Sequence, residues 1–384
     1  MDNKTVALKA CKSYGREEVE DKVAELFELL GGPGAFAGEG QSVFLKVNAL
    51  LGAAPEKGVT THPEVVRAVV RQFQKVTDRI TIGDSPGGPF TTSYLKRVYE
   101  KTGFADVARE TGAELGLDTS TTQVQIPQGK TMKGITICAA MAEADCLVSV
   151  SKFKTHMFLN ITGAIKNLFG SVPGANKFGY HSRFTKDTDF SDLIIDVLLA
   201  SAPDLNIVDA VVGMDGNGPR AGNLVEMGML AAGPDALSLE ALMMSLIGID
   251  FAKNKPLAAA VRRGLCDGSA EGLTVLGDDA GVLAFSGFQL PTKKDISEHV
   301  PDFIMKQFGN RIALRPLPVE GKCTACKRCV ESCPAKAITI EGGLARVDLK
   351  KCVRCYCCHE LCEQDAIVLD RPLLMRLMRM NRDL

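Results

Sequence analysis

The sequence predicts an α/β protein: a large domain with a mostly parallel sheet and crossover helices, followed by a small α+β domain. Strand-like and helix-like segments alternate along roughly the first 315 residues, which is typical of a parallel sheet with crossover helices. After them, nine of the 13 cysteines lie within the 40 residues from Cys323 to Cys362. A chain of 384 residues has room for two such domains and a sizeable core.

The first part of the chain shows three strand-like segments that each precede a helix-like segment. We expect strands over residues 5–11, 42–50 and 79–84, followed by helices over 16–30, from Thr61-His62-Pro63 onward, and from Tyr94 to Glu100. Later strands are expected at 146–150, 205–212, 229–232 and 273–276, with helices at 190–200 and 236–246. In open sheets of this class, ligands bind beyond the carboxyl ends of the strands.

The cysteine-rich segment contains one motif twice. The first copy, KCTACKRCVESCPAKAITI, has the spacing C-x2-C-x2-C-x3-C followed by Pro334, and the second, KCVRCYCCHELCEQDAIVL, repeats the spacing with Glu363 in place of the proline. This spacing is typical of bacterial two-cluster ferredoxins, which the chain resembles over residues 320–371. We therefore expect a small ferredoxin-type domain over 316–371 and a ligand-binding domain over 1–315.

The spacing also predicts which thiolates bind together. Three cysteines on one tight loop can hold three corners of a [4Fe-4S] cubane, and in this pattern the fourth comes from the other copy. Cys357, next to Cys358, is predicted to be a non-ligating neighbour, with a swap of register as the alternative. The predicted ligands are Cys323, Cys326, Cys329 and Cys362 for the first cluster, and Cys333, Cys352, Cys355 and Cys358 for the second.

Neither disulfides nor zinc fit the cysteine pattern as well as clusters do. A disulfide framework is typical of small secreted domains, and the chain begins without a recognisable signal peptide. Zinc sites usually have C-x2-C pairs separated by longer gaps than the four cysteines within eleven residues found here. Cys11, Cys138, Cys146 and Cys266, outside the motif, are expected to be small core residues.

The large domain contains a basic loop. Residues 151–186 have no Asp or Glu, six Lys or Arg and two His, which predicts an anion site; the alternative is a solvated basic surface. If the preceding strand continues, Lys152, Lys154 and His156 share one face. If residues 160–169 are helical, a small polar stripe faces the ligand. That stripe would consist of Gly163, Lys166, Asn167 and Gly170, and Lys177, His181 and Arg183 would complete the wall.

Two glycine-rich loops follow other predicted strands. GDSPGGP (residues 83–89) contains Asp84, and VVGMDGNGPRAG (211–222) follows Asp209 and contains Gly216 and Gly218. Neither matches the dinucleotide fingerprint or the phosphate loop, so each is either a turn or a ligand contact. His62, beside Pro63 at a helix start, is either a cap or an anion contact.

Several of these stretches resemble one family. FLKVNAL with TTHPEVV, TIGDSPGG, SKFKTHMFLNITGAIKNLFG and IVDAVVGMDGNGPRAG look like the domain-of-unknown-function 362 family, many members of which carry a C-terminal two-cluster ferredoxin segment like CVRCYCCHELC. The resemblance brings no settled reaction. The matching family positions are Lys46, Asn48, His62, Asp84, Lys154, His156, Lys166, Asn167, His181, Asp209 and Gly218.

Composition excludes some classes of function. With 45 basic and 46 acidic residues, the net charge of −1 recruits neither nucleic acid nor an anionic membrane, and the chain has no Trp. No apolar run reaches the ~18 residues of a membrane span, so we expect a soluble cytoplasmic protein. An amphipathic basic helix is expected over 372–384, packed on the cluster domain or a partner subunit, with membrane-surface attachment as the alternative.

These features support two hypotheses about function. In the first, a partner protein reduces two [4Fe-4S] clusters, which pass electrons to an anionic small molecule; exposed cubanes would make such a protein oxygen-sensitive, as expected in an anaerobe. Lys152, Lys154 and Lys166 would hold the anion, His156 would move a proton, and Asp84 and Asp209 would orient the cations or bind a metal.

In the second hypothesis the large domain binds or isomerises an anion without redox chemistry, and the clusters are structural or sense oxidation. Its pattern of a strand-end Lys/His pair loosely resembles the lactate racemase N-terminal domain. A simple electron carrier is a third possibility, but a ferredoxin pair needs only about 55 residues, so the remaining chain must position something else.

Overall fold

The computed structural model describes residues 2–291 and 314–370, which form two compact units. The first unit comprises 1–174 and 191–291, and the second comprises 175–190 and 292–384. Residues 292–313, near the end of the expected ligand-binding domain, and the expected helix at 372–384 lie outside the described residues. No helix in 2–291 or 314–370 combines the length and the apolar character needed to cross a bilayer.

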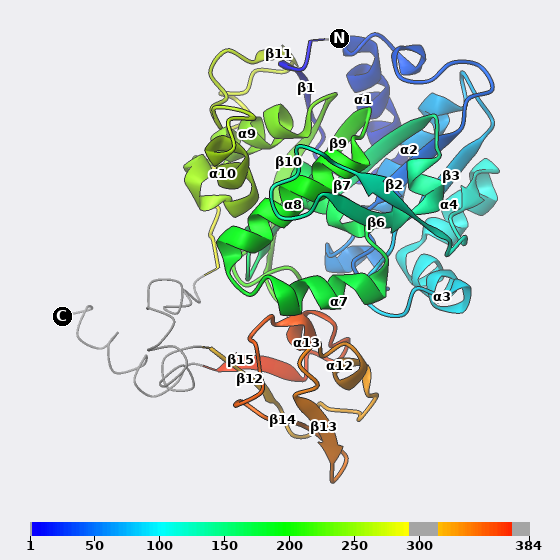
Figure 1. The fold of residues 1–384 in the computed structure, drawn as a ribbon. Helices are drawn as coiled ribbons and strands as arrows, with labels where there is room; N and C mark the ends of the chain where they lie inside the picture. The colour runs from blue at the N-terminus through cyan, green and yellow to red at the C-terminus, as the bar shows by residue number, and fades with distance from the viewer. Residues whose placement is uncertain (1, 292–313, 371–384) are drawn as a thin grey trace. The chain divides into compact units, whose positions relative to one another are not determined.

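The first unit is built on one nine-stranded sheet (Figure 1). Its order is β11-β1-β10-β9-β7-β2-β3-β4, with β8 paired to β7 at one end. The run β9-β7-β2-β3-β4 is parallel, as is β1 with β11, whereas β10 runs antiparallel between β9 and β1. The predicted mostly parallel α/β sheet is therefore confirmed. The strands are β1 Thr5–Ala10, β2 Val43–Val47, β3 Ile80–Gly83, β4 Glu114–Leu115, β7 Cys146–His156, β8 Asn160–Thr162, β9 Leu205–Asp215, β10 Asn223–Gly233 and β11 Thr274–Gly277.

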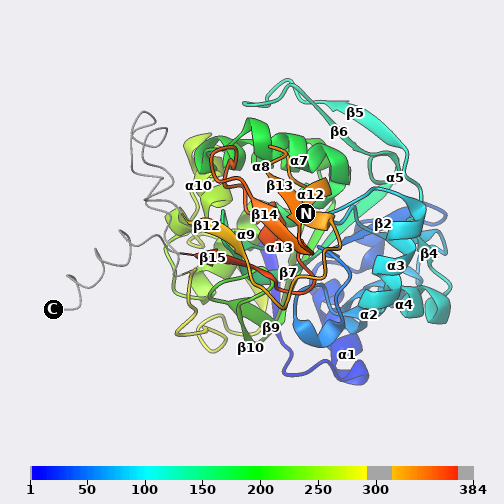
Figure 2. The same ribbon diagram turned by 90° about the horizontal axis from the view of Figure 1, so that it is seen from below.

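Helices connect these strands and cover the sheet. One large core joins α1 to α4 with the apolar side chains on one face of the strands, such as Val23, Val66, Leu95 and Leu45. In Figure 2, α4 lies beside β4. Helix α2 contacts β2, and α9 contacts β9 and β10. The helices are α1 Arg16–Leu29, α2 Pro63–Phe73, α3 Thr92–Thr102, α4 Phe104–Thr111, α5 Ala139–Ala142, α6 Ala164–Asn167, α7 Gly174–Arg183, α8 Asp187–Ser201, α9 Ala236–Leu246 and α10 Lys255–Arg262, with 3-10 turns η1 Pro33–Ala35, η2 Pro55–Lys57, η3 Leu168–Ser171 and η4 Phe251–Lys253.

The segment 160–169 differs from the expected helix. Strand β7 does extend through His156, but the chain then turns and forms β8, which pairs His156 with Asn160. Only the four residues of α6 are α-helical, and η3 follows them. The hairpin satisfies the backbone groups that a longer helix would have used. Gly163, Lys166, Asn167 and Gly170 therefore do not form one helical stripe.

The second unit contains a small α+β region with internal symmetry. A short helix lies within each of the two cysteine motifs, and two antiparallel strand pairs complete the region. This corresponds to the predicted small ferredoxin-like domain. Its elements are β12 Arg315–Pro318, α12 Arg328–Glu331, β13 Ile338–Glu341, β14 Leu344–Val347, α13 Cys357–Glu360 and β15 Ile367–Asp370. The remaining described strands, β5 Thr121–Gln125 and β6 Gly134–Cys138, form a hairpin in the first unit.

Candidate functional site

The first unit buries an unusual number of charged side chains at the carboxyl ends of its parallel strands. Lys46 and Lys152 are at most 1% exposed, and so is Lys154; we call these three the lysine cluster. Their predicted neighbours are also buried. These are Asn48, Asp84, Asn167 and Asp209.

Lys46 belongs to a closed polar network. Its Nζ lies 2.8 Å from Asp84 Oδ1 and donates to Asn167 Oδ1 over 2.9 Å. Asn48 Nδ2 donates to the same Asn167 oxygen, and Ala49 N donates to Asp84 Oδ2. Burial lowers the pKa of Lys46, while Asp84 opposes that shift. The network thus holds β2, the loop after β3 and helix α6 together, with its charge balanced.

Gly170 lies directly against this ion pair. A Cβ added there would collide with Asp84 Oδ1 and with Lys46 Nζ. The backbone at Gly170 also accepts a hydrogen bond from Ser85 N over 3.1 Å. A glycine is therefore required where η3 passes the Lys46–Asp84 pair. This explains why Gly170 belongs to the predicted polar stripe.

Lys152 forms a second closed network with Asp209. Its Nζ lies 3.1 Å from Asp209 Oδ2 and donates to the hydroxyl of Tyr14, which donates in turn to Asp209 Oδ1 over 2.7 Å. The backbone N of His62 donates to Asp209 Oδ2 over 3.0 Å. Burial, followed by the charge of Asp209, raises the pKa of Tyr14. Tyr14 was not identified from the sequence, because one tyrosine in a loop after β1 carries no motif.

His62 serves as a cap in this structure. Its Nδ1 accepts from Glu64 N over 3.3 Å at the start of α2, and its ring stacks on Tyr14 with centroids 3.6 Å apart. Burial lowers its pKa. Of the two roles that the sequence left open, its side chain fills the capping one.

Lys154 differs from the other two lysines. Its Nζ donates to Asn48 Oδ1 over 2.8 Å and to the carbonyl of Val59, but in the described residues it has no carboxylate partner. Burial, and then the charges of Lys166 and Lys152, lower its pKa well below the usual value. A buried cation without a counter-charge is costly. This position therefore favours an anion.

Thr60 is a further buried polar residue, next in the chain to Val59, whose carbonyl accepts from Lys154. It is 1% exposed, and its Oγ1 has no hydrogen-bond partner among the described residues. Buried hydroxyls are normally paired. An anionic ligand near Lys154 could accept its proton.

His156 and Lys166 are the other two predicted catalytic residues. His156 is 2% exposed, and its Nδ1 accepts from Phe158 N and Leu159 N over 3.2 and 3.1 Å. Since Nδ1 accepts two backbone N–H groups, the ring proton resides on Nε2. Lys166 lies on α6 and is half-buried, close enough to Lys154 to affect its pKa.

Glu240 was also missed by sequence reasoning. It is 1% exposed on α9, accepts from Ile165 N over 3.2 Å and from Asn254 Nδ2 over 2.7 Å, and lies where a Cβ on Gly163 would be. Burial raises its pKa. Glu240 thus holds the start of α6, the helix that carries Lys166. The available signal was a single acid within the apolar helix ALSLEALMMSL.

The remaining predicted ligand residues lie elsewhere. Gly218 N donates to Thr155 Oγ1 over 3.1 Å, and a side chain at Gly218 would collide with Thr155; Gly216 has φ +67°. These two glycines are required by the connection between β9 and β10. Lys177 and His181 belong to the second unit, where the His181 ring stacks on Phe190. The lysine cluster is drawn from the first unit alone.

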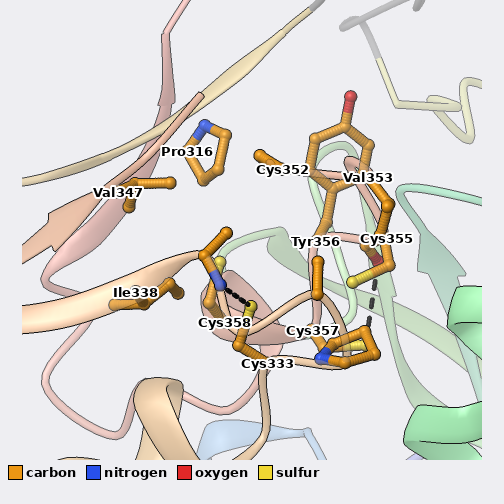
Figure 3. A pocket seen from close by; sticks show the side chains of 13 residues that line it. Pro316, Cys333, Ile338, Val347, Cys352, Val353, Cys355, Tyr356, Cys357 and Cys358 are labelled. Carbon is orange, nitrogen blue, oxygen red and sulfur yellow. Dashed lines mark hydrogen bonds between the residues drawn. The ribbon is translucent and has the colours of Figure 1, made fainter. Parts of the chain in front are cut away.

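In the second unit the cysteines line two pockets. Figure 3 shows one of them, which is lined by Cys357 together with the four cysteines expected to bind the second cluster. The grouping corresponds to the one derived from spacing. The first pocket is lined by Cys323, Cys326, Cys329 and Cys362, and the second by Cys333, Cys352, Cys355, Cys357 and Cys358.

The backbone of both cysteine loops is shaped alike. Six residues other than glycine have positive φ, in pairs 29 positions apart, and such conformations cost about 1 kcal/mol or more each. Left-handed residues of this kind also occur in the concave nests of backbone N–H groups that surround Fe–S clusters. The fourth thiol of each copy accepts a backbone N–H over 3.2 Å, Cys333 from Ala337 and Cys362 from Ala366. The six residues are Ala325, Lys327, Lys336, Arg354, Tyr356 and Asp365.

The thiols require a cationic partner if they are to ionise together. Burial, and then Cys326, Cys362 and Cys323, raise the pKa of Cys329 to about 11. No three His, Cys, Asp or Glu side chains in the described ranges converge on a single metal ion. A cubane presents one iron to each of four separated thiolates, so it fits pockets with thiols spread around the wall.

Comparisons with known proteins agree with both units. A family model described as domain of unknown function (DUF362) matches residues 43–245, and one described as 4Fe-4S dicluster domain matches 316–363. The chain is 32% identical over 273 residues to the thylakoid-associated protein sll1697 of Synechocystis, covering 70% of this chain and 82% of that protein.

Two further similarities are partial. One subunit of the ion-translocating oxidoreductase complex of Methanosarcina acetivorans is 45% identical over 47 residues, which is 12% of this chain and 18% of that one. The lactate racemase apoprotein from Thermoanaerobacterium thermosaccharolyticum aligns with a TM-score of 0.37 and 14% identity, over 62% of this chain and 57% of that chain.

The close approach at Gly170 leads to a first prediction. Gly170→Ala should lower the free energy of unfolding by about 1–3 kcal/mol, because the added methyl group must displace the Lys46–Asp84 pair. Gly34→Ala is the matched control, since a Cβ there meets nothing within 4 Å. If the two variants are equally stable in denaturant titration, the Lys46–Asp84 pair can move aside without loss of folding free energy, and the prediction is wrong.

Lys154 leads to a second prediction, about pH. Between its lowered pKa and the usual 10.5, the unfolded chain holds a proton on Lys154 that the folded chain does not. The free energy of unfolding therefore rises with pH in this window. In titrations from about pH 7 to about pH 10, Lys154→Met should show a smaller rise than the wild type. The exposed Lys57→Met should keep the full rise; a K154M slope equal to that of the wild type would contradict the assignment.

Proposed function

Because this chain belongs to the DUF362 family and ends in a 4Fe-4S cluster-binding domain, we propose that it is an oxidoreductase with two [4Fe-4S] clusters. It passes electrons between them and an anionic small molecule held at the lysine cluster. The observation that carries this proposal is Lys154, a buried lysine without a carboxylate partner among the described residues, in a chain that also has two cysteine pockets.

The two pockets supply four thiols each for the clusters. When bound, the clusters take up and release single electrons, at a potential set by hydrogen bonds, charge and solvent around the sulfurs. The chain contributes inward backbone N–H groups, including those of Ala337 and Ala366. The predicted ligands are those that the spacing assigns, with Cys357 as a neighbour.

Contacts at the lysine cluster support a division of roles among its residues. Asp84 and Asp209 already balance Lys46 and Lys152, so these pairs set the geometry. Lys154 then holds the carboxylate or phosphate of the ligand, with Lys166 beside it. His156 presents Nε2–H as its proton donor, because Nδ1 is occupied by two backbone N–H groups.

An electron-transfer partner protein and a cytoplasmic location complete the proposal. The name of one partial relative describes an oxidoreductase complex, which favours an electron-transfer role. Cysteines for clusters persist where thiols stay reduced, as in the cytoplasm, and exposed cubanes suit an anaerobe. Another relative is named as thylakoid-associated, so attachment at a membrane surface is the alternative location.

The cysteine assignment predicts the outcome of two neighbouring substitutions. Anaerobically prepared protein should contain about eight irons and matching sulfide per chain. Cys358→Ala should lose about half of the iron, because it removes a ligand, whereas Cys357→Ala should keep all of it. Iron analysis with EPR spectroscopy checks both. The reverse result would make Cys357 the ligand in place of Cys358. Zinc in place of iron would contradict the proposal.

The ligand assignment predicts a redox response to anions. Dithionite-reduced protein, freed of excess reductant, is mixed anaerobically with a panel of small carboxylates and phosphates. At least one should reoxidise the clusters, and Lys154→Met should weaken its binding roughly 10- to 100-fold because a charge-assisted hydrogen bond is lost. Lys57→Met is the control.

The same experiment separates the redox function from simple binding or isomerisation. An anion that binds with equal affinity to the wild type and to a cluster-free cysteine variant, and that never reoxidises the clusters, would favour the non-redox function. Absence of any response to the panel, together with unchanged behaviour of Lys154→Met, would contradict a ligand site at the lysine cluster.

A further inference from the structure

The internal repeat makes the two cysteine pockets comparable residue by residue. A shift of 29 positions along the sequence aligns the four cysteines of the first copy of the motif with those of the second copy. The same offset places Arg328 opposite Cys357 and Glu363 opposite Pro334. At these two corresponding positions the first pocket has a pair of opposite charges and the second has two uncharged residues.

In the first pocket the charged residues meet. Arg328, between Cys326 and Cys329, lines the pocket, and its Nη1 forms an ion pair with Oε1 of Glu363. Glu363 follows Cys362 directly in the chain. Their side chains are 28% and 22% exposed, so the pair is partly shielded from water. The ion pair therefore joins the two stretches of chain that supply all four thiols of this pocket.

In the second pocket the corresponding residues are apolar or weakly polar. Cys357 and Pro334 both line it, and Cys357 is 4% exposed (Figure 3). Tyr356 beside it is also 4% exposed, whereas its counterpart Lys327 in the first pocket is exposed. Cys326 of the first pocket is itself exposed. The two pockets thus differ in access to water and in the charges at these two corresponding positions.

Reduction of a cluster adds one negative charge to it and its sulfur ligands. A nearby guanidinium and contact with water stabilise that charge, while a carboxylate and an apolar wall oppose it. We propose that Arg328 and Glu363 tune the first cluster in opposite directions, and that its greater access to water makes it the cluster with the higher reduction potential. The first electron supplied to the protein then resides there. This inference rests on the two-cluster function proposed above.

The two halves of one ion pair give a test in opposite directions. In EPR-monitored redox titrations of the cluster-loaded protein with dithionite and mediators, Arg328→Gln should lower the midpoint potential of the first cluster and Glu363→Gln should raise it. Each shift should be near a tenfold change in the reduced-to-oxidised ratio at fixed ambient potential, about 59 mV for one electron. The double variant should return close to the wild type.

Controls separate tuning from a purely structural role. The second cluster should keep its potential in all these variants, and Arg346→Gln, an exposed arginine on β14, should change neither cluster. Shifts of the same sign in both single variants, no shift, or loss of the first cluster would overturn the inference. If the wild-type protein contains about eight irons, such a result leaves the proposed function standing; a wild-type iron content near four overturns both.

Discussion

Lys46 and Lys152 can remain deep in the sheet because Asp84 and Asp209 lie against their ammonium groups. An uncompensated ion would either lose its charge or destabilise the fold. The two ion pairs connect adjacent strand ends to α6, to the start of α2 and to the loop after β1. Asn48 links the first pair to Lys154, because it contacts both Lys154 and Asn167.

Charge is also the constraint in the cysteine region, with the opposite sign. Four clustered thiols ionise together only when a cationic centre compensates them. Before that happens, the loops hold their shape through strained left-handed residues and backbone N–H groups directed at sulfur. One chain therefore contains a buried lysine that an anionic ligand would stabilise and clustered thiols that a cationic centre would stabilise.

Local patterns predicted much of this arrangement. Alternating strands and helices predicted the parallel sheet, and cysteine spacing predicted how the thiols group, because both are properties of short sequence intervals. Tyr14 and Glu240 were missed because their partners, Asp209 and Ile165, lie far away in sequence. The segment 160–169 was predicted as a helix because its apolar spacing fits one, but pairing of Asn160 with His156 overrides that local preference.

The chain passes between the units three times, because residues 175–190 group with the C-terminal part. The cysteine-rich region is thus not a cassette appended at one end, and a single proteolytic nick between residues 291 and 314 would leave part of its unit covalently attached to the sheet. Transplanting the cysteine segment alone onto another scaffold would leave α7 behind.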